Sequence, residues 1–134
     1  MPFLYHPLVV HFPVALWLTS FLFDVGYATT RDRFYATASR LLIGLGLLAA
    51  VVSIVAGFVD YIPLVNQGVG SAFVQQHRVH SVLAYASTVL YALLFFTRRR
   101  GRGMAAGPYF AGALLGAALI ATTAYLGGEI RRVM

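Results

Sequence analysis

Four histidines are the side chains in this sequence best suited to chemistry, and they fall into two pairs. His6 and His11 lie near the amino terminus, and His77 and His80 lie in the second half of the chain. Neutral imidazole is the commonest metal ligand in proteins and also ligates haem iron. His77 and His80 are three residues apart, which places them on one face of a helix. His6 and His11 are five apart, about 140° around an ideal helix. The histidines are therefore candidate ligands of a metal or a cofactor.

The elements that must position these residues are predicted from composition and hydropathy. The chain of 134 residues is 60% hydrophobic and 10% charged, whereas soluble domains carry about 25% charged residues. A helix needs about 20 apolar residues to cross a bilayer. Four segments qualify, at residues 8–28, 41–59, 79–97 and 108–128. We therefore expect an all-α chain, an integral membrane four-helix antiparallel bundle that forms a single domain over residues 1–134.

Arginine placement predicts the orientation of this bundle. All ten basic residues are arginines, and they lie mostly in the first and third loops, around residues 31–40 and 98–102. Because cytoplasmic loops collect basic residues, we expect both termini outside, in a multi-pass protein of a bacterial inner (cytoplasmic) membrane. The arginines are thus explained by the orientation of the protein in the membrane, and nucleic-acid binding is not expected. The absence of cysteine excludes disulfides, thiolate metal sites and covalent c-type haem attachment.

Depth along the helices favours a haem hypothesis for the inner pair of histidines. Counted from the cytoplasmic ends of their segments, His11 and His80 both lie 17 residues outward, about 26 Å at 1.5 Å per residue. A b-type haem takes one axial histidine from each of two facing helices. We expect His11 and His80 to be these ligands, and Arg78 to meet the propionates.

A non-haem metal site is the alternative, because four histidines exceed what one haem needs. Iron, copper or zinc accepts nitrogen and oxygen ligands, and two acids also reach the outer face. The candidate metal ligands are His6, His11, His77, His80, Asp60 and Glu129. No serine–histidine–acid set or phosphate loop appears, so an enzyme acting on a soluble substrate is not expected.

Two further features carry expectations. Asp24 is an isolated acid on an apolar segment. We expect it to pair with Arg31 or Arg102, because intramembrane charges are usually paired, or to make a polar contact with Ser20, Ser53 or Thr123. Residues 61–76 connect the second and third segments. One interpretation is that they form a loop that covers the histidine site.

Three motifs resemble a known family. They are HPLVVHFPVALW at residues 6–17, GFVDY at 57–61 and YLGGE at 125–129. This pattern is similar to the DUF2231 family, and the matching positions are His6, His11, Asp60, Gly127, Gly128 and Glu129. The chain departs from the family pattern in its last residues, EIRRVM.

The resemblance implies a four-helix membrane protein with a redox setting, because members of the family are sometimes fused to Rieske or cytochrome c modules. Combined with the histidines, it favours a membrane electron-transfer protein that lies in the lipid bilayer and binds haem b on the periplasmic side. Its expected partner is a redox protein complex or quinone. A non-haem metal protein, and a cofactor-free accessory subunit of a respiratory or photosynthetic complex, are the alternatives.

Overall fold

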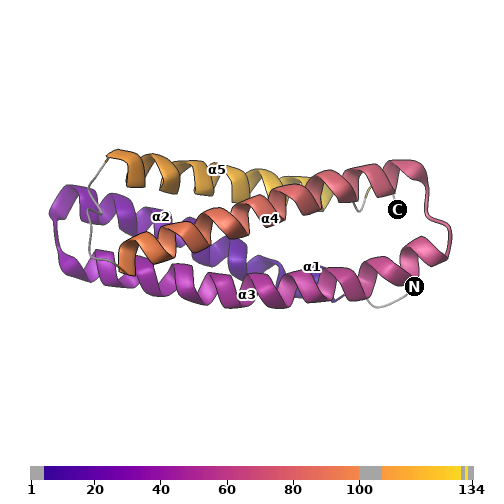
Figure 1. The fold of residues 1–134 in the computed structure, drawn as a ribbon, viewed down its shortest axis with the longest axis horizontal. Coiled ribbons are helices and arrows are strands. Elements are labelled where there is room, and N and C mark those ends of the chain that lie inside the picture. Colours follow the sequence, from indigo (N-terminus) through magenta and orange to yellow (C-terminus); the bar gives the residue numbers. More distant parts are fainter. Residues whose placement is uncertain (1–4, 100–106, 131, 133–134) are drawn as a thin grey trace.

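All regular structure in the described part of the chain is helical. The computed structural model describes residues 5–99, 107–130 and 132. Its elements are α1 (His6–Val9), α2 (His11–Thr30), α3 (Arg33–Asn66), α4 (Ser71–Arg99) and α5 (Gly107–Ile130), and Figure 1 shows them as one elongated bundle. α1 and α2 together make the first span, so the predicted four-helix antiparallel bundle is confirmed.

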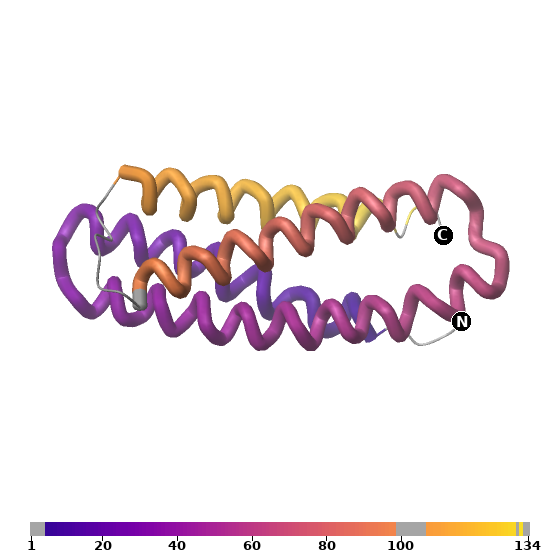
Figure 2. Tube along the Cα trace, viewed as in Figure 1, coloured from indigo at the N-terminus to yellow at the C-terminus, as the bar shows by residue number. Residues whose placement is uncertain are grey.

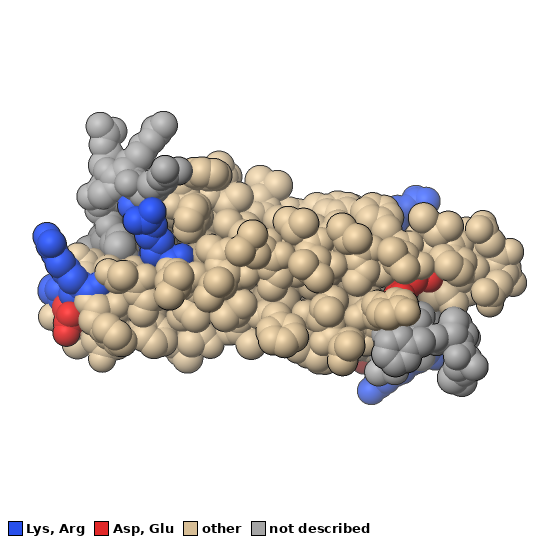
Figure 3. Space-filling view, turned by 90° about the horizontal axis from the view of Figure 1, so that it is seen from below, with Lys and Arg blue, Asp and Glu red and all other residues tan. Residues whose placement is uncertain are grey.

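The surface of the bundle is that of a membrane protein. All four spans are long and apolar enough to cross a bilayer. Large apolar side chains are exposed along each of them, for example Leu22, Leu48, Leu93 and Leu115. On the face shown in Figure 3, charged side chains gather at the two ends and leave the middle uncharged. Lipid, rather than water, is the solvent that fits this middle belt.

Local capping explains where the first hairpin turns. Arg31 adopts a left-handed conformation (φ 60°), and its N–H donates to the carbonyl of Tyr27 at 2.9 Å, which closes α2. Asp32 then caps α3, because its carboxylate accepts from the N–H of Phe34 at 2.9 Å. In the second turn Gly68 has a φ of +82°, a conformation that glycine adopts without strain.

α3 and α4 extend well beyond the predicted apolar segments, whereas the first span and α5 agree with them within two residues. α3 covers residues 33–66 rather than 41–59, and α4 begins at Ser71 rather than near residue 79. The segment 61–76 is therefore mostly helical, and only residues 67–70 connect α3 to α4. Hydropathy marks the residues that cross hydrocarbon, whereas helical hydrogen bonding continues through polar residues until a turn interrupts it.

The four long helices form a square in cross-section. α2 packs against α3 and α5, and α4 packs against the same two helices, so α2 and α4 are diagonal partners. Figure 2 shows that α2 and α4 run in one direction and α3 and α5 in the other. The N-terminal end of α1 and the C-terminal end of α5 lie toward the same end of the bundle, called here the histidine end.

Two stacked aromatic rings fill the centre of the bundle. Trp17 of α2 and Tyr91 of α4 lie 4.1 Å apart between ring centroids, at an interplanar angle of 11°. Both are 1% exposed. Gly46 makes room for the indole, because a Cβ there would lie 2.2 Å from Trp17 Nε1. Thus the middle layer depends on a large ring packed directly against a helix backbone.

A buried ion pair lies at the end opposite the histidines. The guanidinium of Arg98 donates through Nη2 to the carboxylate of Asp24, and both side chains are almost fully buried. Ser39 donates to the same carboxylate at 2.7 Å. The Arg98 guanidinium also lies over the ring of Tyr109, 4.8 Å from the centroid. This cluster links α2, α3, α4 and α5.

The partner of Asp24 differs from the sequence-based expectation. Arg31 is exposed at the end of α2 and does not pair with Asp24, so that expectation is wrong. Arg102, the other expected partner, lies outside the described residues. The actual partner, Arg98, belongs to a helix that continues two residues past its predicted end.

Candidate functional site

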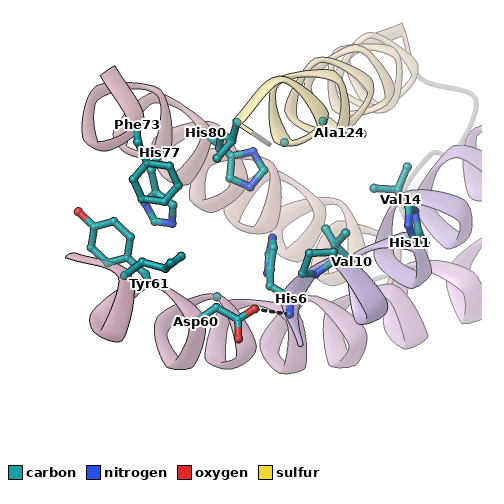
Figure 4. Close-up of a pocket in the computed structure, with 16 residues that line it drawn as sticks. His6, Val10, His11, Val14, Asp60, Tyr61, Phe73, His77, His80 and Ala124 are labelled. Carbon is teal, nitrogen blue, oxygen red and sulfur yellow. Dashed lines mark hydrogen bonds between the residues drawn. The ribbon is translucent and has the colours of Figure 1, made fainter. Parts of the chain in front are cut away.

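The histidine end contains a cavity of about 250 Å³ that touches every helix. Figure 4 shows the rings of His6, His77 and His80 around it, with His11 farther along α2. The walls are mostly apolar and aromatic, which is typical of small-molecule sites. The lining residues are His6, Pro7, Val10, His11, Val14, Gly57, Asp60, Tyr61, Leu64, Phe73, His77, His80, Ala124, Gly127, Gly128 and Ile130.

His6 is held in place by three features of α3. Its Nδ1 lies 2.7 Å from the carbonyl oxygen of Ser53, and since a carbonyl only accepts, Nδ1 carries the proton. Its backbone N–H donates to the carboxylate of Asp60 at 2.7 Å. Gly57 leaves space for the ring, because a Cβ there would lie 3.2 Å from His6 Nδ1. The GFVDY motif therefore supplies two of these three features, Gly57 and Asp60.

His80 has an equivalent seat on α5. Its Nδ1 donates to the carbonyl oxygen of Thr123 at 3.0 Å. A Cβ at Gly127 would lie 3.1 Å from Cε1 of the same ring. The side chain is buried in the bundle. The first glycine of the YLGGE motif thus serves His80 as Gly57 serves His6.

These two rings face one another with one nitrogen each unused. Their centroids are 5.9 Å apart and their planes lie at 86°. With Nδ1 protonated and bound to a carbonyl, Nε2 of the neutral ring keeps its lone pair. Metal-ligating histidines commonly donate their other ring N–H to a backbone carbonyl in this way, which fixes tautomer and orientation. Both rings therefore share this hydrogen-bonding feature with metal-ligating histidines.

His77 joins the group from the next turn of α4. Its centroid is 6.5 Å from that of His80, and its ring stacks on Tyr61 at 4.0 Å and 18°. Nδ1 of His77 lies 3.3 Å from the hydroxyl of Ser81. Phe73 packs beside it, with centroids 5.9 Å apart. His77 is thus oriented mainly by aromatic stacking.

The other predicted site residues are placed differently. His11 is exposed, and its ring contacts no other histidine in the described part of the chain. Arg78 is exposed and does not line the cavity. The Asp60 carboxylate accepts from the backbone of residues 5 and 6, and Glu129 pairs with Arg132 at 3.1 Å. The structure therefore brings His80 together with His6 rather than with His11.

Within residues 5–99, 107–130 and 132, no three histidine, aspartate or glutamate side chains already stand in metal-binding geometry. The three rings share the cavity, but they would have to move to share one ion. The sequence analysis did not identify the carbonyls and glycines that hold His6 and His80. A signal exists, because Ser53 and Thr123 each precede a glycine by four residues.

The comparison with known families agrees with a membrane protein. No curated protein and no solved structure matches the chain. The model of one family, described as a predicted membrane protein, matches residues 3–133. The motifs that build the two histidine seats lie within this match, and the chain belongs to the DUF2231 family of predicted membrane proteins.

Proposed function

We propose that this membrane protein binds a transition metal through Nε2 of His6 and Nε2 of His80, and that the metal serves electron transfer. The observation that carries the proposal is the pair of facing imidazoles, each anchored to a helix carbonyl through Nδ1. Imidazole nitrogen suits iron, copper and zinc. The redox role draws its support from the Rieske and cytochrome c modules that the family resemblance implies.

Haem b is the first form that this metal takes in the proposal. Two imidazoles from diagonal parts of a bundle are the ligand set of a six-coordinate haem. When bound, haem supplies a one-electron couple. The cavity of about 250 Å³ is smaller than the ~300–1,000 Å³ usual for cofactor pockets. A haem would therefore fill the cavity only in part, and no arginine of the described residues lines the cavity to pair with its propionates.

A bare metal ion is the second form, and the position of His77 favours it. The small cavity suits an ion, and the ring of His77 lies next to that of His80. Asp60 and Glu129 are engaged elsewhere, so the ligand set would be nitrogen only. Copper fits such a set and can carry an electron, whereas zinc fits it but has no redox chemistry, so bound zinc would contradict the electron-transfer role. His6 and His80 are ligands in both forms, whereas His77 is a ligand only in this one.

The proposed setting is a bacterial inner membrane, with electrons passed between a donor at the histidine end and quinone or a larger redox complex. A membrane location of the chain is supported by its four spans and its family. If the chain binds no metal, its wide apolar faces suit a cofactor-free subunit of such a complex.

The test is an absorption spectrum and a metal analysis of protein purified in mild detergent. A Soret band with one iron per chain identifies haem, and a stoichiometric metal without a Soret band identifies the bare ion. His6→Ala and His80→Ala should each abolish the signal, and His11→Ala should retain it. Protein that folds but contains neither haem nor metal after loading refutes the proposal.

Neighbouring glycines give a matched pair of variants. Gly127→Ala places a Cβ 3.1 Å from His80 Cε1, whereas a Cβ at Gly128 meets nothing within 4 Å. Gly127→Ala should therefore displace the ring and reduce metal occupancy, and Gly128→Ala should leave it unchanged. Equal occupancy in both variants contradicts the role of the His80 seat.

A further inference from the structure

Three side-chain pairs along the bundle axis follow one numerical rule. His6 faces His80, Trp17 stacks on Tyr91, and Asp24 pairs with Arg98. In each pair the partners are 74 residues apart. Each pair joins the first span, α1 and α2, to α4, and these are the first members of two hairpins, α1–α3 and α4–α5. Three layers of the core therefore relate the two halves of the chain in the same way.

The second helices of the two hairpins follow a rule of their own. Positions 53 and 123 supply the carbonyls that bind the two histidines, and positions 57 and 127 are the glycines beside those rings. Gly46 lies against Trp17, and Gly116 lies against Tyr91, with a Cβ there 3.1 Å from the ring. All three pairs of positions differ by 70. α3 and α5 thus perform matching tasks for α2 and α4.

The packing has the symmetry that these rules require. α2 packs on α3 and α5, and α4 packs on α5 and α3. Corresponding helices run in the same direction (Figure 2). A two-fold axis along the bundle, between α2 and α4, exchanges one hairpin for the other. In a two-fold contact a residue meets its own equivalent only on the axis, which is where the three pairs lie.

We infer that the chain consists of two equivalent helix hairpins, and that the ligand of the pocket sits on the axis between them, held equally by His6 and His80. The ligand part rests on the proposed function. His11 corresponds to Tyr85 under the 74-residue rule, and His77 corresponds to a position outside the described residues. His6 and His80 are thus a symmetric pair, and the protein supplies two equivalent ligands, one from each half.

The axis also explains the ion pair. Asp24 and Arg98 occupy equivalent positions but carry opposite charges. Two copies of the first hairpin would bring two buried carboxylates together, and two copies of the second would bring two guanidiniums together. Such like-charge contacts disfavour the wrong pairing. The charges therefore select the pairing of a first hairpin with a second hairpin.

The ligand part is tested by metal occupancy in the full chain loaded with haem, and separately with Cu²⁺ or Zn²⁺. His6→Ala and His80→Ala should lower occupancy by the same factor, at least ten-fold, with either ligand. His11→Ala should keep at least half of it with either ligand, and His77→Ala should keep at least half of the haem. Unequal losses with His6→Ala and His80→Ala, or a loss of haem with His77→Ala equal to that with His80→Ala, overturn the two-ligand arrangement.

The repeat is tested without any ligand by exchanging an axial pair. Trp17→Tyr combined with Tyr91→Trp places each ring in the equivalent seat, so the double variant should keep the wild-type elution profile and melting midpoint in detergent. The matched control exchanges Trp17 with Ile43, which is equally buried in the same core but off the axis, and it should aggregate. If the Trp17/Tyr91 exchange destabilises the protein as much as the control exchange does, the repeat is overturned. If that exchange is tolerated but the wild-type protein binds no metal, the proposed function is refuted and the repeat stands.

Discussion

Replacing Asp24 by asparagine tests the energetics of the buried ion pair. The substitution keeps the shape of the side chain and an acceptor for Ser39, whose hydroxyl lies 2.7 Å from the carboxylate. It removes the only acidic partner that Arg98 has among the described residues. Nε and Nη1 of Arg98 have no hydrogen-bond partner in that part of the structure. The guanidinium would then be an uncompensated charge in the bundle interior.

The expected cost follows from the burial of both groups. Their side chains are 1% and 3% exposed, so water cannot replace the lost carboxylate charge. Removing one partner of a buried pair costs about 3–5 kcal/mol, which lowers the ratio of folded to unfolded protein by about 100-fold to a few thousand-fold. The double variant Asp24→Asn/Arg98→Met removes the stranded charge as well. It should recover most of the loss, because apolar side chains commonly replace a buried ion pair at little cost.

The assay uses the only tryptophan of the chain. Trp17 lies in the layer next to the ion pair and stacks on Tyr91, so its fluorescence reports loss of the core during unfolding by SDS in mixed micelles. Asp24→Asn should shift the midpoint strongly, and the double variant should shift it back. A loss below about 1 kcal/mol for Asp24→Asn would match an exposed surface pair and would refute the reasoning. A double variant no better than the single one would refute it too.

Three other predictions use the same structure. Gly46→Ala places a Cβ 2.2 Å from Trp17 Nε1, and such overpacking should cost about 1–3 kcal/mol or more in the same unfolding assay; unchanged stability would contradict the close contact. Ser39→Ala removes a hydrogen bond to a charged group and should cost about 1.5–3 kcal/mol, and a cost near zero would show that this bond adds nothing. The chain has no cysteine, so Gln67→Cys and Thr30→Cys, both at exposed positions, report orientation: an impermeant maleimide should label position 67 from the periplasm and position 30 only after permeabilisation. The opposite labelling would reverse the predicted orientation.

The fold could be predicted from the sequence because a membrane-spanning chain must satisfy its backbone hydrogen bonds within apolar segments of a fixed length. Long apolar runs separated by arginines have few alternatives to a helix bundle. The helix ends were less predictable. α3 begins at Arg33 because Asp32 caps it, and it continues to Asn66 through residues that hydropathy alone assigns to a loop. Capping and turn chemistry, rather than hydrophobicity, decide these bounds.

The structure places a different histidine beside His80 from the one expected, and the difference has a physical reason. His80 was assigned to a facing pair, but with His11 as its partner. That pairing assumed that α2 and α4 end at one level, whereas Asp24, six residues before the end of α2, pairs with Arg98, one residue before the end of α4. The short break at Val10 separates α1 from α2, and α1 docks on α3 through Asp60. A tertiary contact of this kind leaves no mark in helical periodicity.

The third helix is much longer than the membrane is thick. Its 34 residues measure about 51 Å at 1.5 Å per residue, against about 30 Å of hydrocarbon. The last turns of α3, with Tyr61 and Leu64 on the cavity wall, therefore reach the headgroup region. If the pocket takes the proposed metal or haem, its delivery need not involve passage through the acyl chains. Empty protein reconstituted in vesicles would then load from one aqueous compartment alone, so loading would be sided and separable from insertion.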